Sequence, residues 1–217
     1  MNINEYQEKA ISTAVYPKKY SIIYPTIGLA GEAGEISEKI VNMMEETTIF
    51  SIKDDLNETE HEQYRNDIKK YRGDIALEIG DVLWYLATLA NDLNVTLSKC
   101  IYIAFGNHYD EFIDAQNNSS IGTSTNLHQC VIHPTLKMFT SVSKISELVK
   151  KYVRDSNEHM DDIRKHKICF EIGEVFKHLS CLCFDMQLEI SNCADANLEK
   201  LFSRKKRDKI KGDGDHR

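Results

Sequence analysis

The 217-residue chain is poor in the residues that break helices, with three prolines and ten glycines. No segment combines strict polar–apolar alternation with turn signals at both ends, so a β-sheet is not expected. No run of about eighteen apolar residues occurs, which argues against a membrane-spanning helix. The first segment, MNINEYQEKA, is polar and lacks the pattern of a signal peptide. These absences favour an all-α protein in the cytoplasm.

Three further absences narrow the function. The six cysteines include no C-x-x-C pair, so we expect them to be reduced and buried. No GxxxxGK[ST] loop is present, which excludes a P-loop nucleotidase. The net charge of −7 argues against nucleic acid as a partner. His128 and His133 near Cys130 raise zinc as an alternative, although three ligands in one polar stretch are a weak signal.

Apolar side chains recur at helical spacing in several segments. They predict helices over 3–14, 26–46, 75–89, about 97–115, 135–154, 168–188 and about 194–206. The charge-dense stretch 45–73 is predicted to be a surface insertion that is helical in part. Residues 116–132 are largely polar and turn-rich, and we predict that they form a linker.

The chain also contains an internal repeat. The segment EIGDVLWYLATLANDLNVTLSKC, from Glu78, aligns without a gap on EIGEVFKHLSCLCFDMQLEISNC, from Glu171. The preceding helices align as well, with Glu35 on Glu147. We therefore predict an all-α bundle of two tandem units, 1–115 and 133–217, which pack as an intramolecular pseudo-dimer.

Two acids stand one turn apart within the most apolar helix, namely Glu78 and Asp81. Buried carboxylates need a compensating cation, because removing an ion from water costs several kcal/mol. Glu32, Glu35 and Glu38 follow one side of an earlier helix. Two helices that project carboxylates inward can hold a hard cation, and an all-oxygen set favours Mg²⁺ or Mn²⁺.

The second unit is not equivalent. Its corresponding positions are Lys144, Glu147, Glu171 and Glu174. A lysine in place of one carboxylate is expected to weaken metal binding there. Conversely, its last helix places Asn197, Lys200 and Arg204 at helical spacing, where they could bind phosphate.

Three segments, GLAGEAGEISEK, LEIGDVLWYLATLA and NLEKLFSRKKRDKIKGDGDHR, resemble those of MazG-type nucleotide pyrophosphohydrolases. These enzymes belong to the all-α NTP pyrophosphatase superfamily, which includes the dimeric dUTPases. The resemblance implies Mg²⁺-dependent hydrolysis of a nucleoside triphosphate to a monophosphate and pyrophosphate, with Glu35 or Glu38 as base or water-orienting group. It implies metal ligands Glu32, Glu35, Glu78 and Asp81, and substrate contacts from Lys39, Trp84, Asn197, Lys200 and Arg204.

The metal motif is complete in the first unit and the Asn–Lys–Arg segment in the second, so we predict one composite site. Other interpretations stay open. The enzyme could be a narrow-specificity dUTPase or dCTPase, or the chain a non-catalytic module that binds a nucleotide or a partner. Trp84 also fits ordinary core packing, and Asn197, Lys200 and Arg204 also fit a solvated face. Homodimerisation is compatible with the sequence.

Overall fold

The computed structural model describes residues 1–51, 57–119, 127–155 and 159–209. Within them the protein is a helical bundle without strands, which confirms the all-α class. The helices are α1 (Ile3–Ile11), η1 (Lys18–Tyr20, a 3-10 helix), α2 (Ile23–Ser51), α3 (Glu58–Asp92), α4 (Leu97–Phe105), α5 (Phe112–Asn117), α6 (Leu127–Asp155), α7 (Asp162–Asp185) and α8 (Ile190–Lys206). No described helix is long and apolar enough to cross a membrane.

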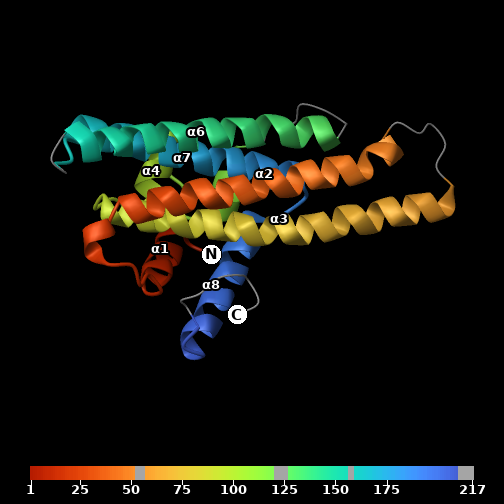
Figure 1. Cartoon of the computed structure of the whole chain (residues 1–217), viewed down its shortest axis with the longest axis horizontal. Coiled ribbons are helices and arrows are strands. Elements are labelled where there is room, and N and C mark those ends of the chain that lie inside the picture. Colours follow the sequence, from red (N-terminus) through yellow and green to blue (C-terminus); the bar gives the residue numbers. More distant parts are fainter. Residues whose placement is uncertain (52–56, 120–126, 156–158, 210–217) are drawn as a thin grey trace.

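Two long helical hairpins make up the bundle (Figure 1). In one, α2 packs on α3; in the other, α6 packs on α7; and α2 contacts α6 between them. Buried residues such as Leu29, Ile36, Ile79 and Leu83 recur at helical spacing and form one continuous core. The short helix α1 lies against α3, and α8 crosses α3 and projects from the bundle.

The predicted insertion at 45–73 is largely a continuation of two helices. α2 runs on to Ser51, and α3 begins at Glu58, so together they extend as a long hairpin (Figure 1). A capping box fixes the start of α3, because the Asn57 side chain accepts from the Glu60 N–H and the Glu60 carboxylate accepts from the Asn57 N–H. Residues 52–56 lie outside the described part.

Two other predicted boundaries were wrong. The helix predicted over 97–115 is two helices, since α4 ends at Phe105, is capped by Gly106 in the left-handed conformation (φ 77°), and α5 starts at Phe112. Both ends of the predicted linker at 116–132 are helical, and its residues 120–126 lie outside the described part. α6 begins at Leu127 and continues through Pro134. Next to this proline, the Thr135 hydroxyl donates to the Val131 carbonyl at 2.6 Å.

Matching contacts recur on the two sides of the bundle. The Gln7 side chain accepts from the Leu97 N–H at 2.9 Å and donates to the Val95 carbonyl at 3.2 Å. The Gln116 side chain makes the same pair of hydrogen bonds to Ile190 and Leu188, the aligned residues of the second unit. By these contacts α5 corresponds to α1, so the second unit is better drawn from the start of α5 than from residue 133.

The two corresponding segments also pair with each other. Asn2 and Glu111 form an antiparallel bridge, in which the Ile3 N–H donates to the Asp110 carbonyl and the Phe112 N–H donates to the Met1 carbonyl. Such reciprocal bonds are what an approximate two-fold axis produces. They support the pseudo-dimer, which stays a prediction.

Two aligned glycines permit the helix crossings that join the units. A Cβ at Gly80 would lie 2.8 Å from the Cys193 carbonyl oxygen on α8. A Cβ at Gly173 would overlap the Cys100 carbonyl oxygen on α4. Only glycine allows backbones to approach this closely, and the first crossing brings α8 to the acidic face of α3.

Candidate functional site

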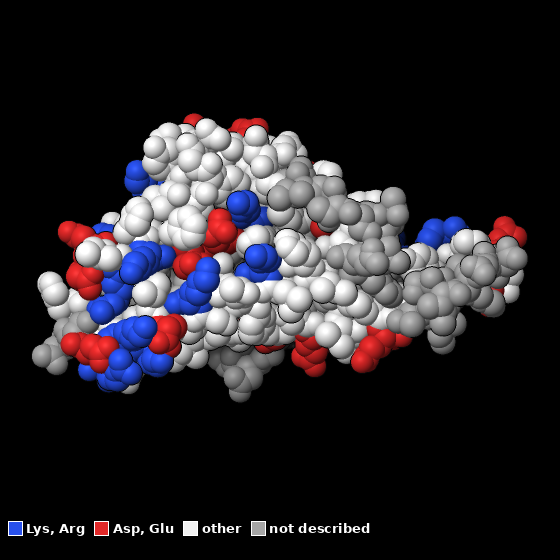
Figure 2. All heavy atoms as spheres, turned by 90° about the horizontal axis from the view of Figure 1, so that it is seen from above, with Lys and Arg blue, Asp and Glu red and all other residues white. Residues whose placement is uncertain are grey.

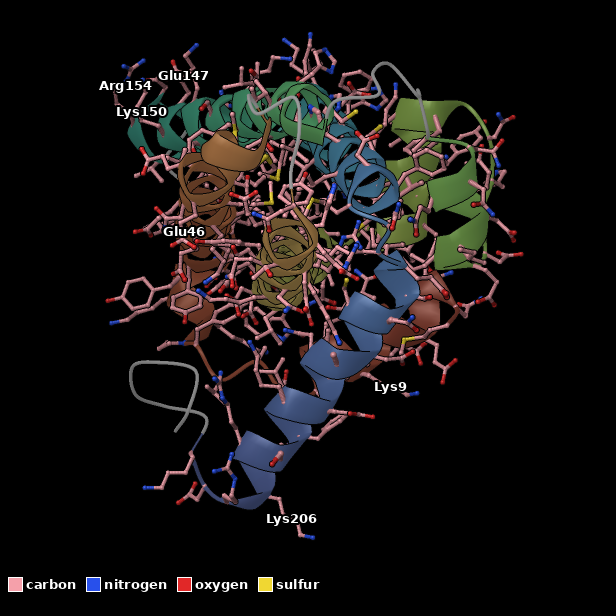
Figure 3. All side chains as sticks on the ribbon, turned by 90° about the vertical axis from the view of Figure 1, so that its right-hand side faces the viewer. Lys9, Glu46, Glu147, Lys150, Arg154 and Lys206 are labelled. Carbon is pink, nitrogen blue, oxygen red and sulfur yellow. The ribbon has the colours of Figure 1, made fainter. Side chains whose placement is uncertain are left out.

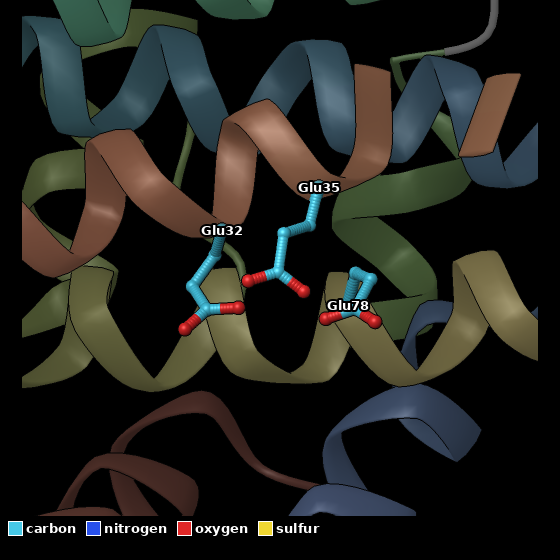
Figure 4. A group of neighbouring side chains, drawn as sticks. All are labelled: Glu32, Glu35 and Glu78. Atoms are coloured by element: carbon cyan, nitrogen blue, oxygen red, sulfur yellow. The ribbon is translucent and has the colours of Figure 1, made fainter. Parts of the chain in front are cut away.

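The acidic site lies between α2 and α3, where three carboxylates converge (Figure 4). Oxygens of Glu32, Glu35 and Glu78 all lie within 4.8 Å of one another. Glu78 is only 2% exposed, Glu32 is half-buried and Glu35 is exposed. Over the described ranges this is the only cluster of three or more acidic, His or Cys side chains close enough to share a metal ion. The zinc alternative at Cys130 and His133 gains no support, and the His128 side chain is not described.

Burial and mutual repulsion change the proton affinity of Glu32 and Glu78. Burial, together with the charges of Asp81, Glu35 and Glu78, raises the pKa of Glu32 to about 8, although Lys200 acts against this. Burial also raises the pKa of Glu78, and the nearby Lys39 only partly offsets the effect. The cluster therefore lacks enough positive charge from the protein to ionise fully at neutral pH.

Lys39 is the one predicted substrate contact that touches this cluster directly. Its ammonium lies 2.9 Å from the Glu78 carboxylate. Partial burial acts to lower the pKa of Lys39, but the hydrogen bond to Glu78 and the surrounding acids outweigh it and raise the pKa. Lys39 is thus fully charged at neutral pH and neutralises one wall of the site.

Asp81, the fourth predicted metal ligand, stands apart from the other three. Its carboxylate accepts from the Asn197 amide at 2.6 Å and is paired with the Lys200 ammonium. The structure thereby brings together side chains from the two halves of the chain, as the composite site requires. Asp81 remains near enough to raise the pKa of Glu32 and Glu78.

The other predicted residues lie at different distances from this centre. Glu38 is exposed and does not belong to the carboxylate cluster. Trp84 is held against α1, because its indole N–H donates to the Ala10 carbonyl at 3.1 Å and to the Thr13 hydroxyl at 2.9 Å. Arg204, one turn beyond Lys200 on α8, is 5% exposed.

An aromatic group beside Glu32 went unnoticed in the sequence. Tyr24 and Tyr85 lie with ring centroids 6.3 Å apart, and the Glu32 charge contributes to the raised pKa of Tyr85, after burial and Tyr24. Gly28 makes room for this arrangement, since a Cβ there would overlap the Tyr85 ring. In the sequence, Gly28 was the sign that a large side chain packs against α2. Only the structure shows that this side chain is Tyr85. Gly31 and Gly34 face open space.

The corresponding position of the second unit is neutralised by lysines. Lys144, which replaces a carboxylate, lies 3.0 Å from Glu171. Glu147 is paired with Lys150 and Lys151 on the outer face of α6 (Figure 3). On the face that carries α6, blue Lys and Arg side chains gather toward one end with acids between them (Figure 2). The positive charge that the first site lacks is built into this one.

Comparison with known proteins shows one family relationship. The Gene 37 protein of Mycobacterium phage L5 is 36% identical over 104 residues, which cover 45% of this chain and 77% of the phage protein. The chain belongs to the family of that phage protein. The name Gene 37 protein states no activity, so the relationship does not assign one. No family model matches the chain, and no solved structure matches it.

Proposed function

We propose that the protein is a Mg²⁺-dependent nucleoside triphosphate pyrophosphohydrolase of the MazG type, with Mn²⁺ as an alternative metal. The observation that carries the proposal is the convergence of Glu32, Glu35 and Glu78 within 4.8 Å. Lys39 would neutralise Glu78 alone, but in the described part of the chain the three acids share this one lysine contact. Such oxygen-rich, charge-deficient clusters suit a small divalent cation.

The donor set fits the metal. Glu32, Glu35 and Glu78 would hold the ion, with Asp81 beside them. When bound, Mg²⁺ supplies charge neutralisation for phosphate and acidifies a bound water. Glu35, the most exposed member of the cluster, is the best placed to orient or deprotonate the attacking water. Glu38 is less suited, because its carboxylate lies outside the cluster.

The substrate would lie across the interface between α3 and α8. Lys200 presents an ammonium beside Asp81, where it can bind phosphate oxygens, and the buried Asn197 amide holds the Asp81 carboxylate in place. Tyr24, which is 42% exposed and lies next to Tyr85, offers a stacking surface for a base. Water attack at the α-phosphorus releases pyrophosphate as the leaving group and leaves the added oxygen on the monophosphate.

A panel of NTPs and dNTPs with Mg²⁺, followed by product separation, tests the proposal. We expect monophosphate and pyrophosphate, and in ¹⁸O-labelled water the label should appear in the monophosphate. The variant Glu35→Gln serves as the inactive control. Diphosphate with phosphate, or no product from any nucleotide, would contradict the proposal.

The same panel separates the alternatives. Turnover of dUTP or dCTP alone identifies a narrow-specificity enzyme. Thermal stabilisation by Mg²⁺ and nucleotide without turnover identifies a non-catalytic binding module. We place the protein in the cytoplasm as part of this proposal, and sedimentation would test whether it forms homodimers.

A further inference from the structure

A cavity lies between the first half of α3 and the end of α7, away from the carboxylate cluster. Its volume is about 900 Å³, within the range of small-molecule sites. Three cations from one helix line it, namely Arg65, Lys69 and Arg72. The opposite wall includes Phe184 and Asp185 from α7. This part of α3 belongs to the charge-dense stretch that the proposed active site does not use.

The three cations lie along one face of α3, because their spacing of four and then three residues follows the helical repeat. Like charges at this spacing repel and mildly destabilise an isolated helix. Within the described ranges none of the three has an ion-pair partner, and the buried Nε of Arg72 has no hydrogen-bond partner. Among the described residues of the lining, Asp185 is the only acidic one. The cavity is therefore electropositive in a chain whose net charge is −7.

Apolar surface accompanies the charge. Phe184 is 48% exposed although it lines the cavity, and Tyr64, Ile68 and Leu188 complete the apolar part of the wall. An exposed aromatic ring beside unpaired cations is a surface that binds a planar ring and an anion together. Arg65 and Arg72 are about 10 Å apart along the helix axis, which matches the length of a polyphosphate chain.

We propose that this cavity binds a nucleoside polyphosphate without a metal ion. Arg65, Lys69 and Arg72 would contact the phosphates, and Phe184 would contact the base. The cations neutralise phosphate directly, in contrast to the carboxylate site, which requires a divalent cation. The limited size of the pocket and the single short row of cations favour a mononucleotide over polymeric nucleic acid, whose binding proteins have extended basic faces.

Calorimetric titration of the full chain with ATP in EDTA tests this site, because removing Mg²⁺ disables the carboxylate site as proposed. Arg65→Gln and Lys69→Gln, both at exposed positions, are each expected to weaken ATP binding about tenfold. Lys70→Gln is the matched control, since Lys70 is the next residue on α3, is exposed and does not line the cavity. ATP affinities of Arg65→Gln and Lys69→Gln equal to that of Lys70→Gln, or no binding in EDTA, would overturn the proposal.

Two further ligands sharpen the result. Tripolyphosphate is expected to bind about tenfold more weakly than ATP, because it cannot stack on Phe184; equal affinity would overturn the base contact. A single-stranded oligonucleotide that binds more tightly than ATP would overturn the choice of a mononucleotide. The outcome is separable from the proposed activity. ATP binding in EDTA that depends on Lys69, in a protein that hydrolyses no nucleotide with Mg²⁺, would uphold this site and reject the pyrophosphohydrolase.

Discussion

The α2–α3 site and its counterpart between α6 and α7 differ in how their carboxylates are neutralised. In the first, Glu32, Glu35 and Glu78 converge, and among the described residues Lys39 is the one cation that contacts them. In the second, Lys144 takes the position of Glu32 and pairs with Glu171 at 3.0 Å. The second site therefore has a lysine where the first has a third carboxylate, and Lys150 and Lys151 pair with its Glu147. The repeat provides a matched control within the same molecule.

The largest difference between the two sites should be catalytic. Glu35→Gln is expected to lower kcat/KM for nucleoside triphosphate hydrolysis by at least about two orders of magnitude, through loss of a metal ligand or general base. The aligned Glu147→Gln should leave kcat/KM unchanged, because Glu147 is paired with lysines on the outer face of α6. Equal effects on steady-state rates would end the distinction between the sites.

The glycine crossings should be equally sensitive if the two halves correspond. Gly80→Ala and Gly173→Ala each place a methyl group against a carbonyl of the crossing helix, and each should lower the free energy of unfolding by about 1–3 kcal/mol. Gly73→Ala, on the same helix as Gly80 but facing open space, should raise it by up to about 1 kcal/mol. Urea denaturation measures all three. Loss of stability in only one of the crossing variants would break the structural correspondence.

Lys200 tests whether the second unit completes the first site. Lys200→Ala should lower kcat/KM about tenfold, because a charge-assisted phosphate contact is lost. The same change frees Asp81 from its ammonium partner, so Mg²⁺ should bind more tightly to the variant. Lys206→Ala, at the far end of α8, is the control (Figure 3). If kcat/KM is unchanged in Lys200→Ala, the second unit does not contribute Lys200 to the active site, and the composite site would be rejected.

The difference between the sites should be partly reversible. Lys144→Glu restores a carboxylate to the second site and removes the partner of Glu171. Without metal, the variant should lose about 1 kcal/mol of stability, a small effect because Lys144 is 54% exposed. With Mg²⁺, calorimetry should detect a second bound ion. Binding of only one ion, as expected for the parent protein, would show that residues other than Lys144 also prevent metal binding at the second site.

The pH dependence of stability should distinguish the sites most subtly. The pKa of Glu32 in the folded protein is about 8, above its ordinary value of 4.5. Between pH 4.5 and about pH 8, Glu32 is therefore protonated in the folded state and ionised in the unfolded chain. Stability in EDTA should therefore fall as pH rises through this window. Thermal denaturation at about pH 6 and about pH 9 should show the fall, and Mg²⁺ should reduce it. If the stability of a Glu32→Gln variant fell equally with pH, a group other than Glu32 would cause the pH dependence.

Local sequence patterns predicted much of the fold. Helical spacing located the long helices, and the burial of the six cysteines was confirmed except at Cys181, which is half-buried. The charge density of 45–73 predicted a surface insertion that is helical in part, and its described residues form the extended ends of α2 and α3. The helix predicted over 135–154 begins earlier, at Leu127, and continues through Pro134.

The sequence by itself determined the helical class, the repeat and the carboxylates at one-turn spacing, since these depend on periods of three to four residues. Only the tertiary structure decided that Asp81 binds Asn197 and Lys200. The other three acids, Glu32, Glu35 and Glu78, form a cluster that does not include Asp81. That choice depends on where α8 crosses α3, and the crossing is set by the close approach at Gly80. Contacts between residues so distant along the chain arise from packing, which no local pattern encodes.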